Sequence, residues 1–594
     1  MKKKLLAGLA LASCAVMALA GVGCNGGGSG TRRGKVQITV WAVSDKNNRT
    51  EMNALEKAFN ESNDRYFAKI IAKPAGFSSS IDGTLRGNSA PNVVQIEDER
   101  YFKGYVDQKL ITNLDEYFVD KTENGEVVRA ASTLDLSDIW ETAVARYRYN
   151  PDTGYSGGNE PLYGLPNGIA PSVMYYNEDA LKENGINVIS IAEEDIAGTK
   201  YLPHGYYVYD EAPATGLTAK GGKYHVFNNK IPMNWDELVS ISKLFTRSYA
   251  EGAGSPTTFG FYNEWWFSFG WSVGGDCLEW DEEKDQYVFA LGEETANYLV
   301  TGKDVITVNG TQYKEGEILS YPDKHFVEDA LAAGSGANYD AVRGYVEGKQ
   351  LYALPSIRDA FKLFLSLSQE KGKPVTEEEY GLQISPTPDI IGNKSKSNLL
   401  TSNEVAFVVE GYNSARELGR LMQTAKKNWN IAPLYQYREY NDDGTLKTVN
   451  GTEVKGKMSA HSGTVCWAIP QNAKAKDGAF QFIEFMAGPE AQKVMMKTNQ
   501  SLPNQKSVAY SDEYLNMTDN YICSNKEAIL MQTANSSVGD WSYLENGSWV
   551  NVWANVLNTD VRNGKMTLDE FFRHDCIEKT NAALKLMHAK KFNG

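Results

Sequence analysis

Alternating apolar and polar positions begin the part of the chain that is expected to fold. In VQITVWAV (36–43), valine and isoleucine alternate with glutamine and threonine, which predicts a strand with one buried face. Met52, Leu55 and Phe59 then recur at helical spacing and predict an amphipathic helix. The stretch APNVVQIED (90–98) predicts a second strand that ends in carboxylates. Strand, helix and strand in this order indicate a parallel α/β sheet.

Helix ends later in the chain carry their own capping residues. In MNWDEL (233–238), Asn234 can cap a helix while Glu237 reaches back to it, which predicts a capping box. Asn177 is expected to begin another helix. Gly185 is expected to end that helix in the left-handed conformation.

Two long stretches fit this α/β pattern poorly. Residues 119–160 and about 281–345 are rich in Asp, Glu, Gly, Tyr and Asn, and we expect them to be insertions on a simpler scaffold. Within the second stretch, DVITVNGTQYKEGEIL (304–319) predicts a hairpin that turns at Asn309 and Gly310.

Composition limits the classes of partner. The 594 residues carry a formal net charge of −15, and such an acidic surface argues against nucleic acid as a partner. The length suggests two or more domains. Aromatic residues make up 11% of the chain, and an excess of them in a surface cleft would suit sugar rings.

The cysteines and the acidic stretches do not indicate a metal site. Cys277, Cys466, Cys523 and Cys576 are far apart and lack the spacing of metal ligands. Outside the cell they could form disulfides, but buried free thiols are at least as good an interpretation. The stretch 120–131 begins like a calcium loop, yet alanine occupies its twelfth position instead of glutamate. We therefore expect no metal and no cofactor.

The N-terminus has the pattern of a secretory signal. Three lysines precede an apolar run (5–20), and small residues then lead to Cys24 and a glycine-rich stretch. This predicts a signal peptide over 1–23 and a flexible tether over 24–35. Cys24 resembles the acylated cysteine of a bacterial lipobox, which would place the protein on the outer face of the cell membrane. Cleavage at Cys14 and an uncleaved transmembrane anchor are the alternatives.

A series of stretches along the mature chain resembles, in order, the extracellular solute-binding proteins of ABC importers, in the large family that includes maltose-binding protein. Two positions depart from the family pattern: Asn92 stands where aspartate is usual, and Asn234 where threonine is usual. The inserted stretches lie outside the resemblance. The stretches that carry it are VQITVWAV, GNSAPNVVQIEDERYFKGYVDQKLITNLDEY (87–117), YGLPNGIAPSVMYYNEDALKENGI (163–186), IPMNWDEL, VAFVVEGYNSARELG, NWNIAPL, SGTVCWAIPQNAKAKDGAFQFIEFMAGPEAQKVM, SLPN (501–504) and VLNTDVRNGKMTLDEFF (556–572).

The resemblance implies a fold of two α/β lobes joined by crossover strands, a periplasmic-binding-protein-like architecture with discontinuous lobes and inserted segments. We expect an N-terminal lobe over 36–166 with 464–500 and a C-terminal lobe over 170–462 with 505–594. The implied function is a lipid-anchored protein that captures a carbohydrate, specifically an oligosaccharide, and delivers it to ABC transporter permease subunits. It would act as a monomer and without turnover. A secreted glycan-degrading enzyme and a ligand sensor with the same fold are the alternatives.

Ligands of open α/β sheets lie beyond the carboxyl ends of the strands, which nominates the loops after each predicted strand. Asp98 and Arg100 could hold sugar hydroxyls there, or could form a plain surface ion pair. Asn167 and Gly168 follow the hinge strand, and Asp45 follows the first strand. The aromatic candidates, each of which could instead belong to the core, are Trp41, Trp265, Trp266, Tyr412, Trp467, Trp549 and Trp553.

Overall fold

The computed structural model describes most of the chain from residue 34 onward. The described residues are 34–44, 48–281, 286–292, 295–308, 310–321, 342, 344–497, 502–518, 523–539, 542, 544 and 546–587. Cys14, Cys24 and Asp45 lie outside them, so what is predicted for these three residues stays a prediction. Among the described residues, no helix combines the length and the apolar character that crossing a membrane requires.

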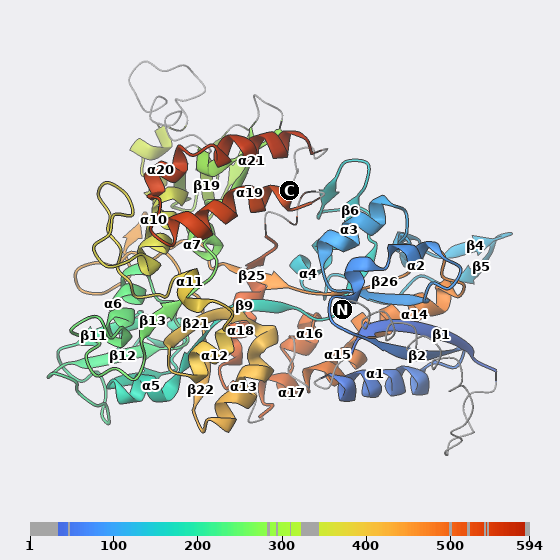
Figure 1. The fold of residues 1–594 in the computed structure, drawn as a ribbon, viewed down its shortest axis with the longest axis horizontal. Coiled ribbons are helices and arrows are strands. Elements are labelled where there is room, and N and C mark those ends of the chain that lie inside the picture. The colour runs from blue at the N-terminus through green and yellow to red at the C-terminus, as the bar shows by residue number, and fades with distance from the viewer. Residues whose placement is uncertain are drawn as a thin grey trace, which may run out of the picture.

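The N-terminal lobe is built on a five-stranded sheet and lies on the right of Figure 1. The predicted alternation is confirmed from Ile38 onward, because Ile38 and Val40 are fully buried, whereas Val36 at the start of the strand is exposed. Met52, Leu55 and Phe59 are buried as predicted, on one face of the first helix. The strands, in sheet order, are β2 (Tyr66–Lys73), β1 (Val36–Val43), β3 (Val93–Ile96), β26 (Cys466–Ala468) and β8 (Gly164–Pro166). The main helices are α1 (Arg49–Ser62), α3 (Glu99–Asp107), α14 (Lys476–Ala487) and α15 (Pro489–Met496).

The C-terminal lobe is larger and contains a second sheet. Asn234 and Glu237 form the predicted capping box, Asn177 caps α5, and Gly185 has a φ of +71°. The strands are β13 (Phe259–Tyr262), β21 (Val405–Gly411), β9 (Ala170–Asn177), β25 (Ala460–Gly463) and β27 (Ser536–Ser537), with β22 (Trp429–Ala432) paired to β9. Its helices include α5 (Glu178–Glu183), α6 (Trp235–Phe245), α7 (Phe267–Ser272), α10 (Ile357–Ser368), α12 (Lys396–Thr401), α13 (Ala415–Thr424), α18 (Lys526–Ala534), α19 (Ser548–Val556), α20 (Leu568–Phe572) and α21 (Cys576–Lys585).

The two lobes are joined by extended segments that cross between the sheets. The chain passes from β8 to β9 and returns from β25 to β26, and β9 and β25 run across the middle of Figure 1. Beside them, Leu502 pairs with Ile169, which lies between β8 and β9. Because each lobe is made of segments far apart in sequence, the predicted two-lobed, discontinuous α/β fold is confirmed.

One boundary differs from the predicted division of the lobes. Helix α16 (Lys506–Ala509) is held by the N-terminal lobe, since the backbone N–H of Lys506 donates to the carbonyl of Asp138 at 2.7 Å. Ser507 donates to the carboxylate of the same aspartate. The predicted place of α16 in the C-terminal lobe is therefore wrong, because sequence order does not reveal which lobe a returning segment contacts.

The first inserted stretch forms two hairpins and a short helix on the N-terminal lobe. The hairpins are β4 (Lys121–Glu123) with β5 (Glu126–Arg129), and β6 (Tyr149–Asn150) with β7 (Tyr155–Ser156); the helix is α4 (Glu141–Ala145). Asn124 and Gly125 have φ angles of +53° and +84° and form the turn between β4 and β5. The residues that resemble the start of a calcium loop therefore serve as a hairpin turn.

The second stretch adds three small sheets to the C-terminal lobe. The predicted hairpin is confirmed as β17 (Ile306–Val308) paired with β18 (Thr311–Tyr313). The other strands are β14 (Leu278–Asp281) with β15 (Gln286–Phe289), and β16 (Ala296–Val300) between β19 (Ile318–Tyr321) and β20 (Leu351–Leu354). The hydroxyls of Tyr155 and Tyr287 are hydrogen-bonded, so the two stretches meet across the lobes.

The four cysteines among the described residues are buried free thiols, as one of the two interpretations had it. Burial raises the pKa of the thiols of Cys523, to about 12, and of Cys576, to about 11. Thiols with raised pKa values are poor nucleophiles, which fits a purely structural role.

Candidate binding site in the cleft between the lobes

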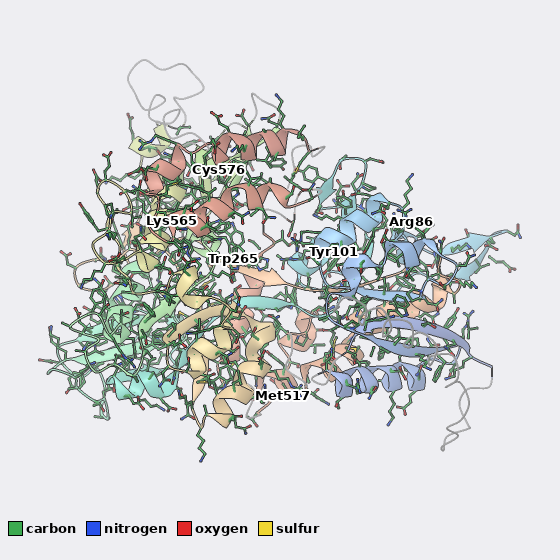
Figure 2. All side chains as sticks on the ribbon, in the orientation of Figure 1. Arg86, Tyr101, Trp265, Met517, Lys565 and Cys576 are labelled. Atoms are coloured by element: carbon green, nitrogen blue, oxygen red, sulfur yellow. The ribbon has the colours of Figure 1, made fainter. Side chains whose placement is uncertain are left out.

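A cavity of about 350 Å³ lies between the lobes, next to the crossover strands. The N-terminal lobe contributes the start of α3, the C-terminal lobe contributes the loop before α7 and the start of α19, and β25 contributes the floor. In Figure 2, Trp265 is labelled on the larger lobe, on the side that faces the N-terminal lobe and Tyr101. The lining residues are Glu97, Asp98, Glu99, Arg100, Arg146, Trp265, His461, Gly463, Thr464, Gly547, Val550 and Asn551.

Asp98 and Arg100 line this cavity at the junction of β3 and α3. Asp98 caps α3 by accepting from the backbone N–H of Arg100 at 2.8 Å, and its carboxylate also pairs with the guanidinium at 2.6 Å. Burial alone would raise the pKa of Asp98, but the hydrogen bonds and charge of Arg100 outweigh it and hold the pKa below its usual value. The ion pair and the cleft position, which were alternatives for these residues from sequence, therefore occur together.

The floor of the cavity is a buried polar network. Arg146 donates from Nη1 to Glu99 Oε2 at 3.1 Å and from Nη2 to the backbone carbonyl of Ser462. The side chains of Arg146 and Glu99 are only 5% and 11% exposed. His461 Nε2 lies 3.3 Å from Arg146 Nη2. Burial and the adjacent positive charge lower the pKa of His461 to about 3, so the imidazole is neutral at physiological pH.

The sequence analysis did not identify Glu99, Arg146, His461 or Asn551 as site residues. Glu99 directly follows the predicted Asp98, and His461 directly precedes the crossover motif SGTVCW, so adjacency was an available signal for both. Arg146 lies in the stretch interpreted as an insertion. No local pattern marks it, because only the tertiary structure brings α4 to the crossover.

The two adjacent tryptophans before α7 differ in burial. Trp265 is 37% exposed and lines the cavity, with its ring stacked near that of Phe267 at 5.9 Å. Trp266 is 3% exposed, donates from Nε1 to Cys277 Sγ, and packs edge-on against Trp553 at 4.4 Å. The two side chains differ in this way although the segment is a loop between β13 and α7.

Five of the aromatic candidates are core residues in this structure, which corrects the expectation that they face the cleft. Trp467 lies on β26, between two other strands of its sheet, and packs edge-on against Phe482 at 5.8 Å. Tyr412 is fully buried in the cluster that contains the crossover strands. The five corrected side chains are Trp266, Tyr412, Trp467, Trp549 and Trp553.

In helix α19, the spacing of the tryptophans does not determine whether their face is buried or faces the cleft. Trp549 and Trp553, four residues apart, share one helix face as predicted, but that face packs inward near Phe289. Val550 and Asn551, on another face of the same helix, line the cavity instead. Spacing shows which residues share a face, and packing decides which face is buried.

The remaining described candidates are not among the residues that line the cavity. Trp41 is half-buried at the end of β1, with the ammonium of Lys73 3.4 Å from its ring centre. Asn167 donates its backbone N–H to the carbonyl of Val465. Gly168, with a φ of +82°, accepts from the hydroxyl of Thr464 at 2.5 Å. Asn167 and Gly168 therefore tie the two crossovers together, and their ligand contact stays a prediction.

Comparison with known proteins agrees with this architecture. A family model described as bacterial extracellular solute-binding protein matches residues 54–520. None of the curated proteins matches the chain. Among solved structures, an ABC substrate-binding protein from Listeria monocytogenes in complex with cycloalternan aligns with a TM-score of 0.53 at 14% identity, over 93% of this chain and 99% of that one.

Two further structures show the same two-lobed arrangement. The GacH receptor of Streptomyces glaucescens, solved unliganded and with acarbose, aligns with a TM-score of 0.51 at 14% identity, over 93% of this chain and 99% of that one. An ABC transporter solute-binding protein from Thermotoga lettingae bound with α-D-tagatose aligns with a TM-score of 0.51 at 12% identity, over 93% and 100%. At these identities the likeness establishes the fold.

Proposed function

Because the chain belongs to the bacterial extracellular solute-binding proteins, we propose that its cleft captures a neutral oligosaccharide and delivers it to the permease subunits of an ABC transporter. The observation that carries this proposal is the pairing, in one cavity, of the half-exposed ring of Trp265 with a wall of hydrogen-bonding groups. A sugar presents an apolar ring face and a rim of hydroxyls, so it needs both kinds of partner. The cycloalternan, acarbose and tagatose complexes of similar structures support a carbohydrate.

The charges of the site favour a neutral ligand over an acidic one. Asp98 is paired with Arg100, and Glu99 with Arg146. Glu97 accepts from the backbone N–H of Gly76 at 2.9 Å. Each cation of the lining is thus engaged by a carboxylate of the same lobe. A uronate or sulfate would also meet more carboxylates than guanidinium groups in the lining, whereas a neutral hydroxyl can use the remaining donor and acceptor positions without this repulsion.

We propose binding without turnover. A glycosidase needs one carboxylic acid that is protonated at the working pH. Asp98 does not meet this requirement, because Arg100 holds its pKa below the usual value. Glu99 is tied to Arg146 and to the hydroxyl of Ser542. These contacts favour the binding protein over the secreted glycan-degrading enzyme.

The function is tested by calorimetry on the purified mature chain. The probes are maltotetraose and cycloalternan as neutral glycans, and a trigalacturonate as the acidic one. Neutral glycans should bind, and the scattering radius of gyration should fall as the lobes close about the crossover strands. The protein should return the glycan unchanged after a day, as judged by mass spectrometry. Binding of the acidic glycan alone, or shortened products, would contradict the proposal.

We propose that Cys24 is acylated and tethers the protein to the outer face of the cell membrane. The support is the small residues before Cys24 and the glycine-rich stretch after it. Cys24→Ala should release the protein from the membrane fraction or block its processing, while Cys14→Ala should leave it anchored. If Cys14→Ala alone releases the protein, the acylated residue is Cys14.

A further inference from the structure

The loop from Asn263 to Trp266 determines the directions of two adjacent tryptophan side chains. The chain leaves β13 at Tyr262 and enters α7 at Phe267, and in between it must bury Trp266 while it presents Trp265 to the cleft. Trp266 is anchored by Cys277 and Trp553. The ring of Trp265 contacts those of Trp266 and Phe267, its immediate neighbours in the chain, so its direction depends on how the loop backbone is held.

Arg562 holds that backbone from 298 residues away in the sequence. Its Nη1 donates to the carbonyl of Glu264 at 2.9 Å, and its Nη2 donates to the carbonyl of Asn263 at 3.2 Å. The guanidinium lies 4.8 Å from the ring centre of Phe364, and the residue is 1% exposed. A planar fork of donors can hold two consecutive carbonyls at once, which a single ammonium does less well.

The same loop has two further contacts that fix its shape. Asn263 Oδ1 accepts from the backbone N–H of Trp265 at 3.0 Å, and Asn263 Nδ2 donates to the hydroxyl of Tyr435 at 2.7 Å. The carboxylate of Glu264 pairs with Lys396 at 2.9 Å. Arg562 is the group that joins the two carbonyls, and it does not line the cavity.

We infer that Arg562 is a positioning residue for ligand binding, which acts by holding Trp265 in its cleft-facing orientation. The inference rests on the proposed function for its effect on affinity. A ring that is already oriented loses less freedom when a sugar stacks on it, so preorganisation strengthens binding without any contact between Arg562 and the ligand.

Affinity provides the first test, with maltotetraose and cycloalternan as the calorimetric probes. Arg562→Lys keeps the charge but not the fork, and should weaken binding at least fivefold. Trp265→Ala and the double variant Trp265→Ala/Arg562→Lys should bind equally, because without the ring there is nothing left to position. Arg438→Met removes an equally buried guanidinium, one that pairs with Glu193, and serves as the control that should keep wild-type affinity.

The orientation of the ring provides the second test, which needs no ligand. The chain is labelled with 5-fluorotryptophan, and the Trp265 resonance is assigned from Trp265→Phe. In Arg562→Lys this resonance should shift and broaden, while it stays unchanged in Arg438→Met. An unchanged Trp265 resonance in Arg562→Lys, or a loss of affinity that adds fully to that of Trp265→Ala, would overturn the inference. If no glycan binds the wild type, the sugar proposal fails, and the resonance still decides the role of Arg562.

Discussion

The two walls of the cleft use their side chains differently. The wall from the N-terminal lobe, with Glu99 and Arg146, is polar, and the groups that face the cavity also hold the lobe together. The wall from the C-terminal lobe presents Trp265, while its neighbour Trp266 performs the structural packing. A substitution on the first wall should therefore change both stability and ligand binding. On the second wall, Trp266 contributes to stability and Trp265 to binding.

The largest expected effects come from substitutions of Trp265 and Trp266, which test whether binding and stability are separated. Trp266→Ala should lower the free energy of unfolding by about 3–5 kcal/mol, because it empties a packed site. Trp265→Ala should leave the melting temperature near wild type and weaken glycan binding by about 2 kcal/mol. Thermal melts and calorimetry on both variants check this. A stable Trp265→Ala with wild-type affinity would remove Trp265 from the binding site.

On the polar wall the same experiment should give a coupled result. Arg146→Met leaves the buried carboxylate of Glu99 without its cation and should cost about 3–5 kcal/mol of unfolding free energy. Chemical denaturation measures this loss. The double variant Glu99→Gln/Arg146→Met should recover part of the stability, since neither charge of this pair is then left without the other. A single variant within about 1 kcal/mol of wild type would contradict a buried, structural pair.

His461, which is neutral at the floor of the cavity, should make the free energy of unfolding depend on pH. The pKa of His461, about 3 in the folded chain, is below the unfolded value of about 6.5, so the unfolded chain binds the proton first. The contribution of His461 to the free energy of unfolding is therefore fully present above about pH 6.5. It is lost as the pH falls, and the loss is about 2 kcal/mol at about pH 5. The measurement is denaturation at both pH values, for wild type and His461→Gln. Identical pH slopes for the two proteins would refute this.

The exposed pair at the rim should matter least. The side chain of Arg100 is 57% exposed, so Arg100→Met should change the free energy of unfolding by less than about 1 kcal/mol. Asp98 would keep its cap on α3, because the cap accepts from the backbone. Paired denaturation curves check the effect. If Arg100→Met lowers the free energy of unfolding as much as Arg146→Met does, the exposed pair at the rim is as important for stability as the buried pair at the floor, and the prediction is wrong.

Local patterns determined much of the framework. The alternation in β1, the apolar face of α1 and the capping box of Asn234 all depend on residues close together in sequence, so the sequence predicted them correctly. The ordered motifs predicted the two lobes, and Asp98 and Arg100 were placed at the cleft because a strand and its following helix define that edge.

The choice of which side chains face the cleft was made only by the tertiary structure. Trp549 and Trp553 share a face by spacing alone, yet that face is buried because Phe289 of an insertion packs near it. Arg146 reaches the floor only because α4 lies beside β25. Burial depends on what covers a residue, and the covering segments here lie hundreds of residues away, as Arg562 does from the loop of Trp265.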